Sequence, residues 1–294
     1  MRNALDIEKF HRPKTVQETI GLLTQQDGGA VLIAGGTDLL PRRQGGRTGI
    51  TKNGLVDISG LGLNYIRETQ DAFLIGAATD INTLASSPVF NTSPYTVMIE
   101  AALFHSTLTL RNRATLGGNL CNASPHADLA LPLLLLDAVL VIEGPHGQKT
   151  IHLDNFFTGP HCTVLEPMEI LTEIRIPRMT EKSGANFIKL TRQHTAIDMA
   201  VVNATTCLSI KDGICVSARI ALGSVGPHPF RAKKAEALLL NHAPEAALFR
   251  ESARLAAKEA SPIDDIRATA AYRKEMIPVL LQQSLEKSLE RSLS

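Results

Sequence analysis

Short apolar runs alternate with apolar residues at helical spacing along the first half of the chain. Apolar runs bounded by glycine, proline or polar clusters predict strands at 30–34, 55–58, 73–77, 139–143, 149–153 and 169–177. Helical spacing predicts helices at 16–23, 79–87 and 95–104. Thr15 and Glu18 fit a capping box at the start of the first helix, and Gly28 and Gly29 are expected to end it.

A polar turn with a paired glycine and then a long apolar run occupy the stretch from Arg113 to Asp137. Ser124 followed by Pro125 predicts a helix start within it, because serine is a preferred N-cap and proline is favoured at the first helical position. Pro132 is expected to break or kink this helix after its second turn, since proline lacks the N–H that the helix interior needs.

The second half of the chain reads as strands followed by helices. Strands are predicted at 185–191, 199–210 and 214–225, and helices at 232–240, 244–259 and 268–293. Asp212 and Gly213 join the last two strands, and this dipeptide is a strong hairpin signal. The polar segment 179–184 reads as a linker. The pattern therefore predicts a first domain over residues 1–178 and an α+β second domain over residues 185–294.

Composition and charge exclude several classes of function. The 294 residues carry a net charge of +1 without a Lys/Arg stripe, which argues against nucleic-acid binding. The longest apolar run, 129–142, is interrupted by Pro132 and Asp137 and is too short to cross a bilayer. The N-terminus lacks the apolar core of a signal peptide. We therefore expect a cytoplasmic protein with no membrane span.

The cysteines and histidines do not form a recognisable reactive or metal-binding pattern. The four cysteines, at positions 121, 162, 207 and 215, contain no C-x-x-C pair, and the nine histidines are scattered. We therefore expect this chain alone to bind neither a metal ion nor an iron–sulfur cluster. No catalytic side chain is assigned.

The first candidate binding feature is a glycine pair at the end of a predicted strand. Gly35 and Gly36 follow the strand 30–34 and precede Thr37 and Asp38. Backbone N–H groups can approach a phosphate there, because glycine lacks a β-carbon and tolerates positive φ. An ordinary strand-end turn is the alternative. Basic residues follow that either extend the cradle or form a solvated loop: Arg42, Arg43, Arg47 and Lys52.

The second candidate feature is the glycine pair in the later polar turn. Gly117 and Gly118 lie between the hydroxyl of Thr115 and the amide of Asn119. Asp128 falls in the first turn of the helix predicted from Ser124. Its carboxylate there either interacts favourably with the helix dipole or accepts from a ribose or from a water that contacts a phosphate. The dinucleotide fingerprint G-x-G-x-x-G and the P-loop are both missing. Without further information, the two glycine pairs indicate binding of a nucleotide phosphate.

Several motifs, taken in order, make this interpretation specific. Segments 33–39 (IAGGTDL), 114–120 (ATLGGNL), 123–128 (ASPHAD), 156–159 (FFTG) and 265–273 (DIRATAAYR) follow one another along nearly the whole chain. In this order and spacing the chain resembles the FAD-binding subunit of molybdenum hydroxylases, the family of the medium subunits of xanthine dehydrogenase and carbon monoxide dehydrogenase.

The resemblance implies an α+β fold of the vanillyl-alcohol-oxidase type. Its FAD-binding domain would comprise two α/β subdomains, here about 1–55 and 56–178. A small C-terminal domain with a three-stranded sheet and helices would follow, over residues 185–294.

The resemblance also implies which residues hold the FAD. The segments 32–38 and 115–119 would wrap the pyrophosphate mainly through backbone amides. Ser124 and Asp128 would contact the ribityl or ribose region, and Leu171 would pack near a ring. Lys189 would lie near the pyrimidine edge of the flavin, where a cation stabilises the anionic reduced form. The expected FAD-binding residues are therefore Leu32, Ile33, Ala34, Gly35, Gly36, Thr37, Asp38, Thr115, Gly117, Gly118, Asn119, Ser124, Asp128, Leu171 and Lys189.

The family's chemistry implies a place in an electron-transfer chain. A large partner subunit would carry molybdopterin, and a small partner would carry two [2Fe–2S] clusters. Electrons from a purine or another N-heteroaromatic substrate would reach FAD on this chain, and then NAD+, oxygen or another acceptor. The alternatives are a stand-alone flavin-dependent oxidoreductase of the same fold and a non-catalytic assembly subunit.

Two positions depart from parts of the family. Some relatives carry a cysteine-bearing insertion for a further iron–sulfur cluster, whereas only Cys121 follows Asn119 here. That cluster is therefore expected to be absent. Some relatives place a tyrosine over the flavin near the position of Ile197. An aliphatic residue there resembles relatives that react with NAD+.

Overall fold

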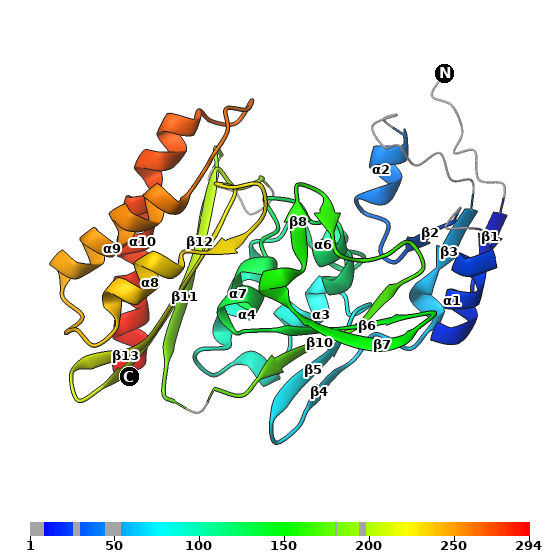
Figure 1. The fold of residues 1–294 in the computed structure, drawn as a ribbon, viewed down its shortest axis with the longest axis horizontal. Helices are drawn as coiled ribbons and strands as arrows, with labels where there is room; N and C mark the ends of the chain where they lie inside the picture. Colours follow the sequence, from blue (N-terminus) through cyan, green and yellow to red (C-terminus); the bar gives the residue numbers. More distant parts are fainter. Residues whose placement is uncertain (1–8, 26–29, 45–53, 180, 194–197) are drawn as a thin grey trace.

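The computed structural model describes residues 9–25, 30–44, 54–179, 181–193 and 198–294. Within these residues the strands form three larger sheets and one two-stranded ribbon. The three sheets follow one another along the longest axis of the molecule, in the order of the sequence (Figure 1). Ile197 lies outside the described residues, as do Gly28, Gly29, Arg47 and Lys52.

The first sheet is parallel and has β3 in its centre. Its strands are β1 (Lys9–His11), β2 (Ala30–Ile33) and β3 (Gly54–Asp57), and its helices are α1 (Val16–Gln25) and α2 (Leu39–Gln44). The predicted N-cap is confirmed, because Thr15 Oγ1 accepts a hydrogen bond from Glu18 N at 3.0 Å. The Glu18 carboxylate accepts from Lys14 N, one residue before the position that a capping box predicts. Helix α2 replaces the start of the expected loop and carries Arg42 and Arg43.

The second sheet is antiparallel, and its central strand is the one that comes last in the sequence. Its order is β4-β5-β10-β6-β7, with β4 (Ile66–Glu68), β5 (Ala72–Gly76), β6 (Val139–Gly144), β7 (Gly147–His152) and β10 (Ile170–Pro177). The strands predicted at these places are confirmed, and β4 is an additional one. The ribbon of β8 (Phe157–Gly159) and β9 (Cys162–Thr163) follows η3 (Leu153–Asn155).

Helices cover one face of this second sheet (Figure 1). They are α3 (Ile81–Ala85), α4 (Thr96–Leu103), α5 (Leu108–Arg111), α6 (Leu116–Cys121) and α7 (Ala130–Leu135), with the short turn η2 (Pro88–Phe90). The turn η1 (Ile58–Gly60) instead follows β3 and contacts β2 of the first sheet. Phe73, Ile75 and Ile174 of the sheet pack with Met98 of α4 and Leu116 of α6 in one buried cluster. Burial of such side chains contributes about 1.5–3 kcal/mol each.

The predicted helix start at Ser124 is wrong. The glycine pair at 117–118 lies inside α6, and the next helix, α7, begins only at Ala130. The Ser124 hydroxyl accepts from His126 N at 3.2 Å, and Pro125 O accepts from Ser224 N at 2.8 Å. The segment therefore forms turns that are joined to the C-terminal region instead of a helix. Pro132 does not break α7, because it lies in the first turn, where no N–H donor is needed.

The C-terminal sheet is an antiparallel meander, β11-β12-β13-β14. Its strands are β11 (Gly184–Leu190), β12 (Val202–Lys211), β13 (Ile214–Gly223) and β14 (Phe230–Arg231), followed by α8 (Lys233–Leu239), α9 (Ala246–Glu259) and α10 (Ala270–Leu293). The predicted hairpin is confirmed, with φ of +53° at Asp212 and +76° at Gly213. The expected three strands gain a two-residue fourth, because Phe230 and Arg231 pair with the end of β13.

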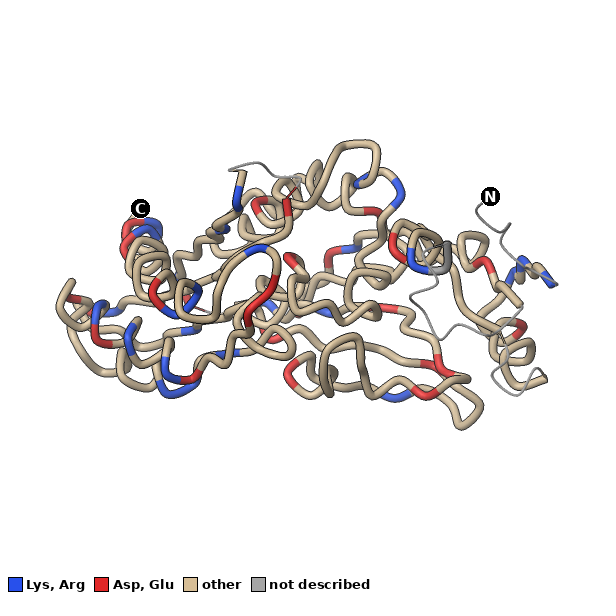
Figure 2. The backbone as a smooth tube through the Cα atoms, turned by 90° about the horizontal axis from the view of Figure 1, so that it is seen from above, with Lys and Arg blue, Asp and Glu red and all other residues tan. Residues whose placement is uncertain are grey.

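Both faces of the C-terminal sheet are covered. Phe187 and Ala221 belong to the core shared with α4 and α7, whereas Leu208 and Leu222 pack with α9 and α10. Alternate residues of a strand point to opposite faces, so this sheet joins its own helices to the middle of the molecule. Figure 2 shows basic and acidic residues interspersed along the chain. Among the described residues, no helix is both long and apolar enough to cross a membrane.

Candidate functional site

One large cavity, of about 870 Å³, is lined by residues from all three sheet-bearing parts of the chain. Residues of β2 and the turn after it form one wall, residues near α6 form another, and Lys189, Met199 and Arg267 come from the C-terminal region. The structure brings every sequence-predicted binding residue to this cavity: Leu32, Ile33, Ala34, Gly35, Gly36, Thr37, Asp38, Thr115, Gly117, Gly118, Asn119, Ser124, Asp128, Leu171 and Lys189.

The first glycine turn presents a row of backbone donors to the cavity. The N–H groups of Gly35, Gly36, Thr37 and Asp38 have no hydrogen-bond partner among the described residues. Gly36 has a φ of +72°, which turns the chain sharply after β2. Successive free amides in such a turn form a concave site for an anion.

Gly35 also sets how closely the two glycine-bearing segments approach. A β-carbon at Gly35 would lie 1.8 Å from the carbonyl oxygen of Arg113 and 2.6 Å from its carbonyl carbon. The backbone before α6 therefore packs directly on the first turn, and only glycine permits that contact.

The second glycine pair makes hydrogen bonds within the protein. Gly117 N donates to Ala77 O at 2.8 Å, and Gly118 N donates to the Oγ1 of Thr115 at 3.1 Å. These amides therefore donate within the protein, and their contact with a phosphate stays a prediction. A β-carbon at Gly117 would lie 2.6 Å from Ala77 O, so this glycine allows α6 to pack on the backbone after β5. The Oδ1 atom of Asn119 is buried and has no partner among the described residues.

Asp128 and Lys189 form a buried ion pair at the C-terminal side of the cavity. Lys189 Nζ lies 2.8 Å from Asp128 Oδ2, and the two side chains are 2% and 6% exposed. Asn203 Nδ2 donates to Asp128 Oδ1 at 2.9 Å, and Lys189 Nζ donates to Phe104 O at 3.1 Å. Burial raises the pKa of Asp128, and the hydrogen bonds from Lys189 and Asn203 oppose this shift.

This pair changes the interpretation of both residues. Asp128 lies just before α7, so its expected place in the first turn of a helix that starts at Ser124 is wrong. The ammonium of Lys189 is matched by a carboxylate. Its expected place near the pyrimidine edge of the flavin stays a prediction. The sequence analysis did not identify Asn203 as a site residue. The one indication was a single amide side chain within an otherwise largely apolar predicted strand.

The side chains at the other edge of the cavity connect α2 to the ribbon. Arg42 Nε lies 3.1 Å from Asp38 Oδ2, and Arg42 Nη2 lies 2.9 Å from His161 Nε2. His161 Nδ1 lies 2.8 Å from Asn122 O. Arg42 therefore lies at the cavity and is not part of a wholly solvated loop. Leu171 is buried on β10, beside the bulge between residues 171 and 173.

Comparisons with known proteins agree with this architecture. Residues 5–179 match the family described as the FAD binding domain in molybdopterin dehydrogenase, and residues 186–288 match the CO dehydrogenase flavoprotein C-terminal domain. The chain is 32% identical over 285 residues to the carbon monoxide dehydrogenase medium chain of Hydrogenophaga pseudoflava, covering 96% of this chain and 97% of that one. It is 28% identical over 287 residues to the xanthine dehydrogenase FAD-binding subunit of Escherichia coli O157:H7, covering 97% of each.

Solved structures show the same fold. The carbon monoxide dehydrogenase structure from Hydrogenophaga pseudoflava superposes with a TM-score of 0.93 at 32% identity, over 98% of this chain and 99% of that one. Quinoline 2-oxidoreductase from Pseudomonas putida 86 gives a TM-score of 0.90 at 26% identity, over the full length of both chains. The α+β fold expected from the motifs is confirmed, and so is FAD as the cofactor of this family. The chain belongs to the family of FAD-binding subunits of molybdenum hydroxylases.

Proposed function

We propose that FAD binds in this cavity with its pyrophosphate on the first glycine turn. The observation that carries the proposal is the run of four N–H groups from Gly35 to Asp38 on the cavity wall, which have no hydrogen-bond partner in the described part of the chain. Backbone donors of this kind suit a diphosphate, because they hold negative charge without an opposing side chain. Apolar residues beside the turn, including Val31, Ile58 and Ile170, suit a flat ring system.

The remaining predicted residues support that turn or line the rest of the cavity. Gly117 braces α6 against the backbone after β5, which fixes the distance between the two glycine-bearing segments. The buried Oδ1 of Asn119 is an acceptor that a ligand donor would satisfy. Leu171 lines the cavity, and the Lys189–Asp128 pair forms the wall of the cavity on the side of the C-terminal sheet. Bound FAD supplies one- and two-electron chemistry, so these residues need only bind and orient it and exclude water.

We further propose that the chain is the flavin subunit of a molybdenum hydroxylase complex. A large molybdopterin subunit and a small subunit with two [2Fe–2S] clusters would deliver electrons to this chain, which would pass them to NAD+ or another acceptor. The substrate would be a purine or another N-heteroaromatic compound. The likeness to xanthine dehydrogenase and quinoline 2-oxidoreductase subunits supports that class.

Purification tests the proposed function against its two alternatives. The chain purified alone should show flavin absorbance at about 450 nm, and a colourless, intact chain would indicate an assembly subunit. The complex should turn over one of a panel of purines, nicotinate, quinoline, aldehydes and carbon monoxide, with NAD+ or oxygen as acceptor. Turnover of an organic substrate by the isolated chain would instead indicate a stand-alone oxidoreductase.

An exposed apolar patch lies at the rim of the cavity. It consists of Leu103, Phe104, Leu108 and Leu110, which are 42–54% exposed, and Leu110 also lines the cavity. The Arg111 side chain donates to the carbonyls of Leu103 and Ser106, which holds the patch together. Exposed apolar patches often mark protein contacts. This position next to the cofactor supports docking of the electron-donating small subunit here.

Leu108→Glu should weaken binding of the small iron–sulfur subunit at least tenfold, about 1.4 kcal/mol. The reason is that assembly would bury the new carboxylate without a partner. Affinity can be measured by titrating the flavin-loaded chain with that subunit. Val279→Glu is the matched control, because Val279 is 46% exposed on α10 and lies outside the patch. Equal affinities for the two variants would rule out this docking surface.

A further inference from the structure

Three basic side chains line the cavity among the described residues, and they differ in how their charge is matched. Arg42 is paired with Asp38 beside the first glycine turn, and Lys189 is paired with the buried Asp128. Arg267 contacts Asp265, with Nη1 2.9 Å from Oδ2. That carboxylate is shared, because Arg273 Nη2 lies 2.7 Å from its other oxygen. Two guanidinium groups thus face one carboxylate.

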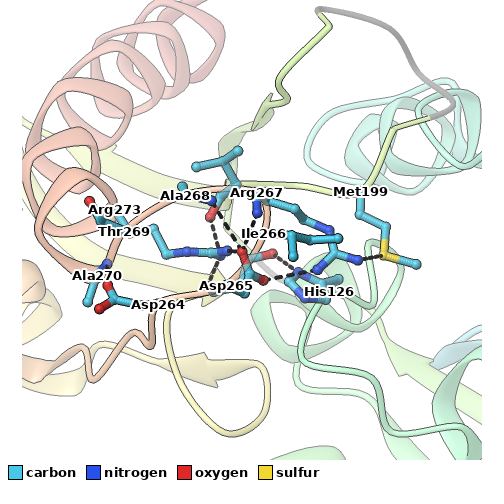
Figure 3. Close-up of polar contacts among 12 residues, drawn as sticks. His126, Met199, Asp264, Asp265, Ile266, Arg267, Ala268, Thr269, Ala270 and Arg273 are labelled. Carbon is cyan, nitrogen blue, oxygen red and sulfur yellow. Dashed lines mark hydrogen bonds and ion pairs between the residues drawn. The ribbon is translucent and has the colours of Figure 1, made fainter.

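Arg267 keeps hydrogen-bonding capacity that no strong acceptor among the described residues uses. Its Nη2 lies 2.7 Å from the Sδ of Met199, and a thioether is only a weak acceptor. Figure 3 shows Arg267 between Met199 and Asp265, in the loop before α10. The nearby carboxylate of Asp198 accepts from Arg192 N, and among the described residues it forms no ion pair with Arg267.

The loop that carries Arg267 is rigidly organised. Asp265 Oδ1 accepts from Arg267 N at 2.8 Å and from Ala268 N at 3.2 Å. Burial alone would raise the pKa of Asp265, but these hydrogen bonds, with those from the Arg267 and Arg273 side chains, hold it well below its usual range. Arg273 is 1% exposed and donates to Val201 O and Ser224 O, each at 2.8 Å. Because Arg273 and Asp265 hold this loop in place, the guanidinium of Arg267 is pre-organised for a ligand.

The neighbouring histidine does not add to this charge. His126 lies next to the Arg267 cluster, and burial, followed by the charges of Arg267 and Arg273, lowers its pKa to about 4. It is therefore neutral at pH 7. His105, on the other side of the Lys189–Asp128 pair, has its pKa lowered to about 4 by burial and by the charges of Lys189 and Arg111.

We propose that Arg267 binds the oxygen-bearing edge of the flavin ring and stabilises the negative charge that the ring gains on reduction. The inference rests on the proposed function, in which the pyrophosphate occupies the first glycine turn. One ring of FAD must then reach the C-terminal side of the cavity. Adenine offers no oxygen and gains no charge, whereas the flavin ring has two carbonyl groups. Reduction by two electrons with uptake of one proton leaves one negative charge, which suits a planar guanidinium.

Arg267→Gln should therefore make the bound flavin harder to reduce. We expect the two-electron reduction equilibrium to fall about tenfold, which is about 30 mV in midpoint potential. Arg267→Lys keeps the charge and should stay within about threefold of the unaltered protein. The measurement is a dithionite titration of the flavin-loaded complex with a redox dye at pH 7, with FAD content determined in parallel. Arg254→Gln, at an exposed arginine of α9, is the matched control.

Each outcome distinguishes the proposal from its competitors. An Arg267→Gln protein with full FAD content and an unchanged potential would overturn the role of Arg267 while leaving the proposed function intact. A shift of the same size in Arg254→Gln would overturn it too. Loss of FAD from Arg267→Gln but not from Arg267→Lys supports a charged contact, whereas loss from both excludes a charge-based role. An unaltered chain without FAD would overturn the proposed function itself.

Discussion

Gly35→Ala should weaken FAD binding at least about 100-fold, or roughly 2.7 kcal/mol. A β-carbon at this position would lie 1.8 Å from the carbonyl oxygen of Arg113, far inside any permitted contact. The carbonyl oxygen belongs to the backbone and the β-carbon is fixed directly to it, so no side chain can move aside. The first turn or the segment before α6 must shift, and either movement displaces the N–H groups of residues 35–38. Loss of two hydrogen bonds to a charged phosphate, each contributing about 1.5–3 kcal/mol, accounts for this magnitude.

Gly21→Ala is the matched control for that substitution. Gly21 lies within α1, and a β-carbon there would have nothing within 4 Å. The substitution should leave FAD affinity unchanged and stabilise the protein by about 0.5–1 kcal/mol, since alanine favours a helix over glycine. Flavin absorbance per protein after gel filtration and a fluorescence titration with FAD measure both variants. Normal affinity in Gly35→Ala would show that the contact between the two turns does not govern binding.

Lys189→Met should lower the free energy of unfolding by about 3–5 kcal/mol, the usual cost of leaving one buried charge unpaired. The Asp128 side chain is 6% exposed. Among the described residues its carboxylate would retain the hydrogen bond from Asn203 and the neighbouring ring of His105, 3.9 Å away. Burial already raises the pKa of Asp128, and removal of the cation would raise it further. A carboxyl group with a raised pKa in the folded state loses stability as pH rises through that pKa. The variant should therefore be less impaired at pH 5 than at pH 7.

The double variant Asp128→Asn with Lys189→Met tests this explanation directly. It removes both charges and keeps an oxygen that can accept from Asn203, so it should recover at least about half of the lost stability. Urea unfolding of both variants and of the unaltered protein, at saturating FAD and at both pH values, gives the comparison. A loss of less than about 1 kcal/mol in the free energy of unfolding of Lys189→Met would show that the ion pair contributes no more than a surface pair. A double variant no more stable than Lys189→Met would show that the unpaired Asp128 carboxylate is not the cause of the loss.

Local features of the sequence determined most of the elements. Thr15 caps α1 because a hydroxyl at that place reaches an N–H three residues later. Asp212 and Gly213 turn the chain because both tolerate positive φ, so β12 and β13 follow as a hairpin. The motifs around the two glycine pairs identified the family, since their order extends over nearly the whole chain. In these cases the decisive interactions lie within a few residues of one another or within a motif that can be read directly.

Only the tertiary structure decided what the site residues contact. The segment before α7 is joined to the end of β13, because Ser224 N donates a hydrogen bond to Pro125 O. The engagement of Gly117 depends on Ala77, and the neutralisation of Lys189 depends on Asp128. Arg267 belonged to a quoted motif, yet its place at the cavity comes from Asp265 and the packing of α10. Ser224, Ala77 and Asp128 are each at least 40 residues away in the sequence from the residue that they contact. Local pattern carries no information on which distant groups meet when the three sheets pack together.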